Sequence, residues 1–144
     1  MKILIINGPN LNFLGIREPH IYEDTTYKDI CKKIQTYCKQ NKIKVKIIQT
    51  NHEGKIIDLL QKSHFNLKLK GIILNAGGYT HTSVAIKDAI SSINKPVIEV
   101  HLSDISKRED FRKISLITEN CVATFMGEHL NSYIKAINYL KDME

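Results

Sequence analysis

Short apolar runs alternate with longer amphipathic segments along this chain. Five runs rich in Ile, Val and Leu predict buried strands at 2–7, 43–49, 71–74, 96–100 and 122–126. Between them, apolar residues recur at helical spacing and predict helices at 26–40, 53–65, 83–93 and 130–141, the first capped by Thr25. The polar stretch 102–120 breaks this rhythm and is expected to hold one short helix near Phe111.

The regular alternation predicts an α/β fold, a flavodoxin-like doubly wound sheet of five parallel strands with helices on both faces. Right-handed crossovers favour the strand order 2-1-3-4-5. A chain of 144 residues without repeats or linkers fits one catalytic domain over 1–144. In such a sheet ligands bind outside the carboxyl ends of the strands, where the strand order reverses. We therefore expect the chemistry to follow the first, third and fourth strands.

Composition and charge narrow the classes of partner. No apolar run approaches the roughly 18 residues that span a bilayer, and the apolar start is too short for a signal peptide, so we expect a cytoplasmic protein. The net charge of +6 comes from dispersed lysines, which favours a solvated surface over a nucleic-acid partner. Three cysteines without a CxxC pair argue against a disulfide framework or a zinc site.

The segment after the first strand runs from Asn7 to Tyr22 and contains Asn10 and Arg17. It exceeds the length of about two to six residues that is usual for a strand-to-helix loop. Because it carries Leu, Phe, Ile and Tyr, it is not composed like a disordered linker. We interpret it as a functional lid, with a packed surface loop as the alternative.

The segment after the third strand runs from Asn75 to Ser83, with two glycines and His81 between them. Paired glycines allow close backbone approach to a ligand, and a helix starting near Ser83 would offer free N–H groups to an anion. Glycines before a helix are, however, more often a turn than a binding site. The segment matches neither a P-loop nor a G-x-G-x-x-G fingerprint, which counts against nucleotides.

The segment after the fourth strand combines an acid–base pair with arginines. Glu99 and His101 are two apart, so they share one face of the strand. A carboxylate beside imidazole orients the ring and stabilises its protonated form, which suits a general acid, although a buried structural pair is the alternative. Arg108 and Arg112 follow and could clamp a carboxylate or hydroxyls, or could simply belong to a solvated helix face.

Four ordered blocks of the chain resemble the type II 3-dehydroquinate dehydratases: 7–22, 49–54, 75–83 and 99–103. The resemblance implies a hydro-lyase that needs no cofactor and no metal. Its reaction removes water from 3-dehydroquinate through an enolate to give 3-dehydroshikimate, in the shikimate pathway of chorismate and aromatic amino-acid biosynthesis. It also implies a homo-oligomer, a dodecamer built as a tetramer of trimers, with no nucleic acid and no membrane as partner.

The resemblance also implies catalytic roles for five residues. Tyr22 would be the base that removes a proton from the carbon next to the ketone, and Arg17 would activate it. Asn10 would hold a water that stabilises the enolate. His101 would protonate the departing hydroxyl, with Glu99 as its orienting partner.

The remaining implied roles concern binding. The substrate carboxylate would be held by Asn75, Ser103 and the backbone at Leu102, and the ring hydroxyls by His81 and Arg112. Arg108 would support the transition state as a second cation near the first loop, and Asp88 would reach into the site of a neighbouring subunit.

The chain departs from the family pattern at Asp104, at 105–107, at Ile114 and at 126–131. These departures concern the turn after the fourth strand and contacts between subunits, and none removes a matched catalytic residue. The alternative is a non-catalytic flavodoxin-like binding module for a small molecule, but the phosphate fingerprints are missing. A receiver-type signalling domain would need acidic residues where Asn7 and Asn75 stand.

Overall fold

The computed structural model of the protein describes residues 1–16 and 25–143. Its strands are β1 (Lys2–Asn7), β2 (Lys44–Gln49), β3 (Leu69–Asn75), β4 (Val97–His101) and β5 (Ala123–Met126). Its α-helices are α2 (Tyr27–Gln40), α3 (Glu53–His64), α4 (Val84–Ser92), α5 (Asp110–Lys113) and α6 (Leu130–Asp142). Four short 3-10 helices are η1 (Leu11–Phe13), η2 (Gly77–His81), η3 (Ile105–Lys107) and η4 (Thr118–Asn120).

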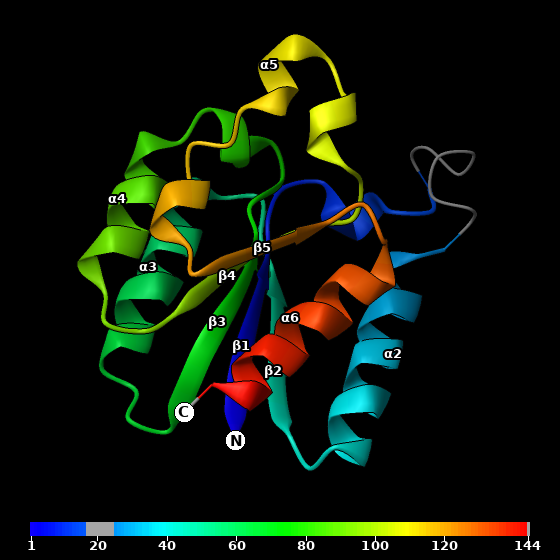
Figure 1. The fold of residues 1–144 in the computed structure, drawn as a ribbon, viewed down its shortest axis with the longest axis vertical. Coiled ribbons are helices and arrows are strands. Elements are labelled where there is room, and N and C mark those ends of the chain that lie inside the picture. The colour runs from blue at the N-terminus through cyan, green and yellow to red at the C-terminus, as the bar shows by residue number, and fades with distance from the viewer. Residues whose placement is uncertain (17–24, 144) are drawn as a thin grey trace.

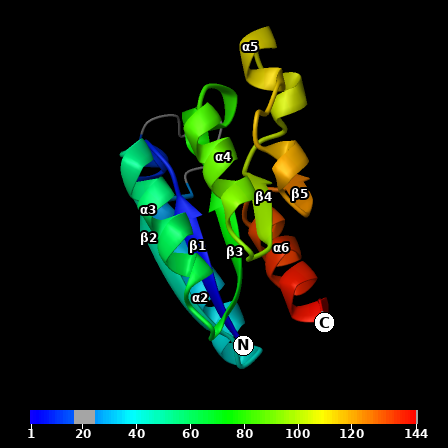
Figure 2. The same cartoon turned by 90° about the vertical axis from the view of Figure 1, so that its left-hand side faces the viewer.

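The five strands form one parallel sheet in the order β2-β1-β3-β4-β5, which confirms the predicted topology. Helices α2 and α6 cover one face of the sheet, and α3 and α4 cover the other (Figure 1, Figure 2). The short helix α5 lies beyond the carboxyl ends of the strands (Figure 1). The carboxyl ends of all five strands therefore lie at the same edge of the sheet, beneath α5.

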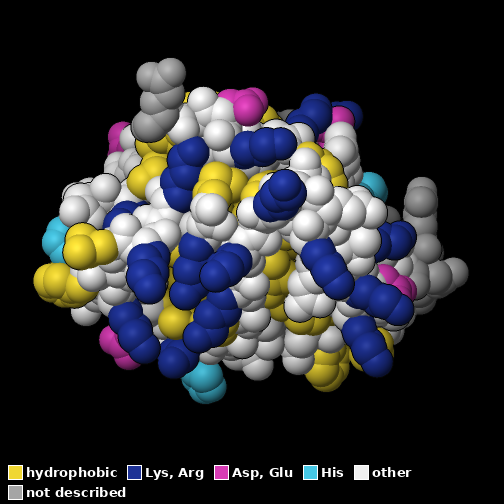
Figure 3. All heavy atoms as spheres, turned by 90° about the horizontal axis from the view of Figure 1, so that it is seen from below, with side chains coloured by type: hydrophobic (Ala, Val, Ile, Leu, Met, Phe, Trp, Pro, Cys, Tyr) yellow, Lys and Arg dark blue, Asp and Glu magenta, His cyan; other side chains and the backbone are white. Residues whose placement is uncertain are grey.

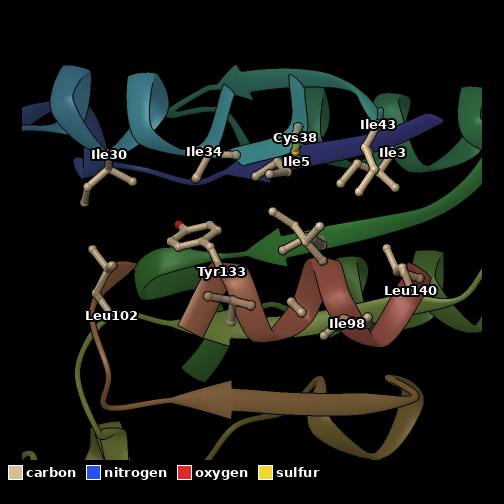
Figure 4. Packing of buried hydrophobic residues seen from close by; sticks show 14 of the residues in the cluster. Ile3, Ile5, Ile30, Ile34, Cys38, Ile43, Ile98, Leu102, Tyr133 and Leu140 are labelled. Atoms are coloured by element: carbon tan, nitrogen blue, oxygen red, sulfur yellow. The ribbon is translucent and has the colours of Figure 1, made fainter. Parts of the chain in front are cut away.

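Strict alternation along the strands divides the apolar residues between two cores. Ile3 and Ile5 of β1 pack with α2 and α6, whereas Leu4 and Ile6 of the same strand pack with α3 and α4. Figure 4 shows the first of these clusters, in which side chains of α2 and α6 meet those of β1 and β4. Successive side chains of a strand point to opposite faces, so a continuous apolar run is what a doubly covered strand requires.

Element boundaries differ from the prediction in ways that local chemistry explains. The cap of α2 is Thr26, not Thr25: its hydroxyl accepts the backbone N–H of Asp29 at 3.1 Å, and the Asp29 carboxylate accepts the Thr26 N–H at 3.4 Å. This reciprocal capping box needs an acid three residues after the cap, which Thr25 lacks. Strands β3 and β4 also extend one residue further than expected, so that Asn75 and His101 are their last residues.

The fold gathers lysines that look dispersed in the sequence. Figure 3 shows many Lys and Arg side chains on the face seen from below, where the strands begin. Lys2, Lys44 and Lys68 line a hollow on this face. Because it lies opposite the carboxyl ends of the strands, its charge is remote from the expected ligand site. In the described part of the chain, no helix is both long and apolar enough for a membrane span.

A close backbone contact joins the ends of β1 and β3. The N–H of Gly8 donates to the carbonyl oxygen of Asn75 at 2.7 Å. A Cβ atom at Gly8 would lie only 2.6 Å from the carbonyl oxygen of Ala76. That oxygen belongs to the backbone and cannot rotate away, so glycine is required at this position.

Gly8→Ala is therefore expected to lower the free energy of unfolding by roughly 1–3 kcal/mol, the usual cost of overpacking. Gly54→Ala is the control, because Gly54 lies in α3 and an added Cβ meets nothing within 4 Å. That change should leave stability equal or raise it, since Ala is the better helix former. Urea denaturation of both variants measures the difference, and equal midpoints would show that the Gly8 contact is not constraining.

Candidate active site

A cavity of about 220 Å³ opens at the carboxyl ends of β1, β3 and β4. These are the three strands after which ligand-binding residues were expected. The cavity is lined by Pro9, Asn10, Leu11, Asn75, Gly77, Gly78, His81, His101, Leu102, Ser103, Ile105, Arg108 and Arg112. The polar members can meet an ionic ligand, since they include two arginines, two histidines and two asparagines.

Most of the candidate residues meet at this cavity. Eight of them line it: Asn10, Asn75, His81, His101, Leu102, Ser103, Arg108 and Arg112. Glu99 lies behind His101 and contacts its ring. Asp88, on α4, is not among the lining residues. Arg17 and Tyr22 lie outside the described residues.

The pair Glu99–His101 is built as the alternation of β4 predicts. Both residues are buried, and His101 Nε2 lies 2.6 Å from Glu99 Oε2. Three hydroxyls complete the carboxylate's shell: Ser115 at 2.6 Å on Oε2, and Thr118 at 2.5 Å and Thr124 at 3.0 Å on Oε1. These hydroxyls were not predicted, because they come from segments that meet Glu99 only in the folded chain.

These contacts fix the charge of Glu99. Burial alone would raise the pKa of the carboxyl, but the hydrogen bond and charge of His101, with the hydroxyls of Ser115 and Thr118, outweigh it and lower the pKa to about 2. An ionised carboxylate can only accept, so His101 Nε2 carries the hydrogen of their bond. The other ring nitrogen, Nδ1, is left to exchange a proton with a ligand.

Asn10 is positioned through its backbone. The residue adopts a left-handed conformation with φ of 68°, which Asn tolerates better than most residues. Its N–H donates to the side-chain oxygen of Asn51 at 3.1 Å, and Gln49 donates to the same oxygen at 3.0 Å. The turn that starts η1 is thereby tied to the end of β2, and it carries Asn10 to the cavity wall.

His81 is held by a carbonyl group from the segment that follows α5. Its Nδ1 lies 2.7 Å from the backbone oxygen of Ile114. A carbonyl oxygen can only accept, so Nδ1 carries the hydrogen and Nε2 remains for a ligand. The departure at position 114 does not disturb this bond, because it uses the backbone and not the side chain.

The helix α4 starts where it was expected, with Ser83 as its N-cap residue. The hydroxyl of Ser83 accepts the N–H of Ile86 at 2.9 Å and donates to Glu53 Oε2 at 2.5 Å. The side-chain cap and a nearby carboxylate therefore occupy the helix terminus. Ser83 is also absent from the cavity lining.

The two arginines supply positive charge to the cavity. Arg108 Nη1 donates to the hydroxyl of Ser103 at 3.3 Å. Arg112 Nε lies 3.0 Å from Glu109 Oε2, and its guanidinium stands 5.0 Å from the ring centre of Phe111. Guanidinium groups bind carboxylates and hydroxyls through several donors, so the cavity suits a small ligand that carries both. Among residues 1–16 and 25–143, no group of three His, Cys, Asp or Glu side chains could hold a metal ion.

The chain as a whole matches a known protein family. Residues 1–141 match the family model described as "Dehydroquinase class II". The chain belongs to the class II dehydroquinase family. Two curated relatives, both called 3-dehydroquinate dehydratase, come from Fusobacterium nucleatum and Clostridium acetobutylicum. The first is 49% identical and the alignment covers 97% of this chain and 96% of the relative; the second is 48% identical, with 99% and 98% covered.

Solved class II dehydroquinases share the whole fold. The type II dehydroquinase of Butyrivibrio crossotus is 48% identical and superposes with a TM-score of 0.95, covering 99% of this chain and 98% of that one. The type II dehydroquinase of Propionibacterium acnes is 33% identical, with a TM-score of 0.90 over 96% and 94% of the two chains. These likenesses confirm the predicted family and the flavodoxin-like architecture.

The lowered pKa of Glu99 predicts a pH dependence of stability. Its folded pKa of about 2 lies below the ordinary value of 4.5. The ionised Glu99 carboxylate therefore stabilises the fold above about pH 4.5, and this contribution is lost as pH falls from there toward 2. Between pH 4.5 and 2, the free energy of unfolding of Glu99→Gln should therefore fall less steeply with decreasing pH than that of the wild type.

Urea denaturation at several pH values between 2 and 6 measures this slope directly. Glu109→Gln is the matched control, because it removes a carboxylate from the exposed surface beside Arg112. The control should keep the wild-type slope. Parallel curves for wild type and Glu99→Gln would refute the role given to the buried carboxylate.

Proposed function

We propose that this protein removes water from 3-dehydroquinate to give 3-dehydroshikimate, with His101 as general acid and Tyr22 as base. The observation that carries the proposal is the pair of His101 with an ionised, buried Glu99 at the wall of a cavity that also holds two arginines. Such a pair presents one ring nitrogen for proton transfer, and the arginines attract a carboxylate.

The first step breaks a C–H bond next to the ketone. Tyr22 takes the proton as its phenolate, and the bond electrons move onto the ketone oxygen to form an enolate. A free tyrosine has a pKa near 10, so Arg17 has to favour the phenolate by its charge. A water held by Asn10 stabilises the enolate oxygen in the manner of an oxyanion hole.

The second step expels the hydroxyl. The enolate re-forms the ketone, its electrons make the new carbon–carbon double bond, and the carbon–oxygen bond breaks. His101 gives a proton to the departing oxygen, which leaves as water. After the product leaves, Tyr22 gives up its proton to solvent and His101 takes one from solvent, which restores both groups without consuming a cofactor.

Binding groups orient the substrate between acid and base. Asn75, Ser103 and the backbone at Leu102 hold the carboxylate, and His81 and Arg112 hold the ring hydroxyls. Arg108, whose guanidinium contacts Ser103, supports the transition state as a second cation near the first loop. This arrangement is supported by the cavity lining, to which all six residues contribute. We take residues 1–144 as one catalytic domain, because all five strands belong to a single sheet.

The test follows enone absorbance after purified protein is mixed with 3-dehydroquinate. The wild type should turn over, whereas Tyr22→Phe and His101→Asn should each lose roughly 10²–10⁴ in kcat, the scale of general acid–base catalysis. Tyr139→Phe and His64→Asn are matched controls, because both side chains lie on helices away from the cavity. Both controls should keep wild-type rates. Binding of 3-dehydroquinate without turnover by the wild type would favour a non-catalytic binding module.

We also propose a dodecameric, cytoplasmic enzyme in which Asp88 reaches the site of a neighbouring subunit. The exposed position of α4 residues such as Val84 supports a contact between chains on that helix. Twelve chains of 16.5 kDa predict a particle of about 200 kDa by light scattering. Asp88→Ala should reduce that mass or the activity, and a monomer of full activity would contradict the proposal.

A further inference from the structure

A chain of buried hydrogen bonds runs from the cavity wall to the interior of the protein. The side-chain amide of Asn75 donates to the hydroxyl of Tyr133 at 3.1 Å, and that hydroxyl donates to the side-chain oxygen of Asn7 at 2.5 Å. All three residues are buried. Asn7 and Asn75 are register partners at the ends of β1 and β3, and Tyr133 reaches them from α6.

The surroundings of the hydroxyl are apolar. Figure 4 shows the Tyr133 ring among side chains of α2, α6 and the sheet, in the part of the cluster near Leu102 and Ile30. Burial raises the pKa of Tyr133, so the hydroxyl keeps its proton at any ordinary pH. It is thus available as one donor and one acceptor, and both Asn side chains use it.

The donor and acceptor in each of these hydrogen bonds can be assigned, because a backbone N–H can only donate and a hydroxyl has one hydrogen. The backbone N–H of Gly77 donates to the side-chain oxygen of Asn75 at 3.2 Å, so that oxygen faces Gly77. The amide nitrogen of Asn75 then faces Tyr133. Because a tyrosine hydroxyl has a single hydrogen, it accepts from Asn75 and donates to Asn7.

The orientation of the Asn75 amide determines what it offers to a ligand in the cavity. Asn75 lines the cavity, and only one of its two amide hydrogens is used by Tyr133. The second hydrogen is available to an anionic oxygen. If the amide turned over, its oxygen would replace these hydrogens and repel a carboxylate.

We propose that Tyr133 is a positioning residue that holds the Asn75 amide with its N–H toward the substrate carboxylate. The proposal rests on the function proposed above, in which Asn75 binds that carboxylate. Tyr133 itself does not line the cavity and acts through Asn75. Losing its hydroxyl would leave a buried donor on Asn75 and a buried acceptor on Asn7 without their partner. The Asn75 amide would then be held by the N–H of Gly77 alone and would be free to tilt out of line with the carboxylate.

The chain offers a matched control for a lost tyrosine hydroxyl. Tyr37 on α2 donates to the side chain of Asn138 on α6, also at 2.5 Å. Neither Tyr37 nor Asn138 lines the cavity. Tyr37→Phe therefore removes a tyrosine–asparagine bond to α6 without touching the substrate site.

The experiment compares steady-state kinetics with 3-dehydroquinate and thermal unfolding for Tyr133→Phe and Tyr37→Phe. Tyr133→Phe should raise KM by about tenfold with a smaller change in kcat, because the weakened contact of Asn75 with the carboxylate binds the ground state and the transition state alike. Tyr37→Phe should lower Tm by a comparable amount and leave both kinetic constants within about twofold. An unchanged KM in Tyr133→Phe, or the same change in both variants, would overturn the proposal.

A double-mutant cycle with Asn75→Ala tests whether Tyr133 acts through Asn75. The double variant should be no worse than Asn75→Ala alone, whereas multiplied losses would mean that Tyr133 acts elsewhere. If Tyr133→Phe does not fold, Asn7→Ala keeps the ring but removes the acceptor that directs the Tyr133 hydrogen away from Asn75. The hydroxyl is then no longer fixed as an acceptor for Asn75, so KM should rise; an unchanged KM would refute the proposal. An inactive wild type would instead refute the proposed function, so the two failures are distinguishable.

Discussion

The structure depends on one buried carboxylate, that of Glu99. Because water cannot reach it, hydrogen-bond donors of the protein must surround it. It is 0% exposed, and four donors surround it. They come from β4, from the segment after α5, from η4 and from β5. Removing a hydrogen-bond partner from a buried charge is costly, so the Glu99 carboxylate holds these four segments together. The same carboxylate orients the ring of His101 at the cavity wall, with the hydrogen of their bond on Nε2.

The parallel sheet explains why the remaining site residues meet there. Parallel strands bring all their carboxyl ends to one edge, and the order β2-β1-β3-β4-β5 places the reversal between β1 and β3. At that reversal Asn7 and Asn75 lie side by side, and the space beneath them is filled from α6 by Tyr133. The site therefore has two supports, a charged one under His101 and a neutral amide–phenol chain under Asn75.

The sequence predicts the architecture and most of the cavity lining, because both follow from local periodicity and from one rule about parallel sheets. His101 and Asn75 could be placed at strand ends by counting along an apolar run. The hydroxyl of Thr118 beside Glu99 could not, since nothing local links residues 19 apart in the chain. Tyr133 lies in the predicted helix 130–141, but its hydrogen bonds could not be predicted because they join it to strands far away in the sequence. The helix start near Ser83 could be predicted, but the hydrogen bond from Ser83 to Glu53 could not, because that carboxylate belongs to another helix.

The most direct test of this account is a crystal structure of the protein with bound 3-dehydroshikimate. The account predicts the product in the cavity, with its carboxylate within about 3 Å of the Asn75 amide nitrogen and the Ser103 hydroxyl. His101 Nδ1 should face the carbon from which the hydroxyl departs. A product bound elsewhere, or turned so that His101 faces the ketone, would contradict the division of the site into an acid side and a carboxylate side.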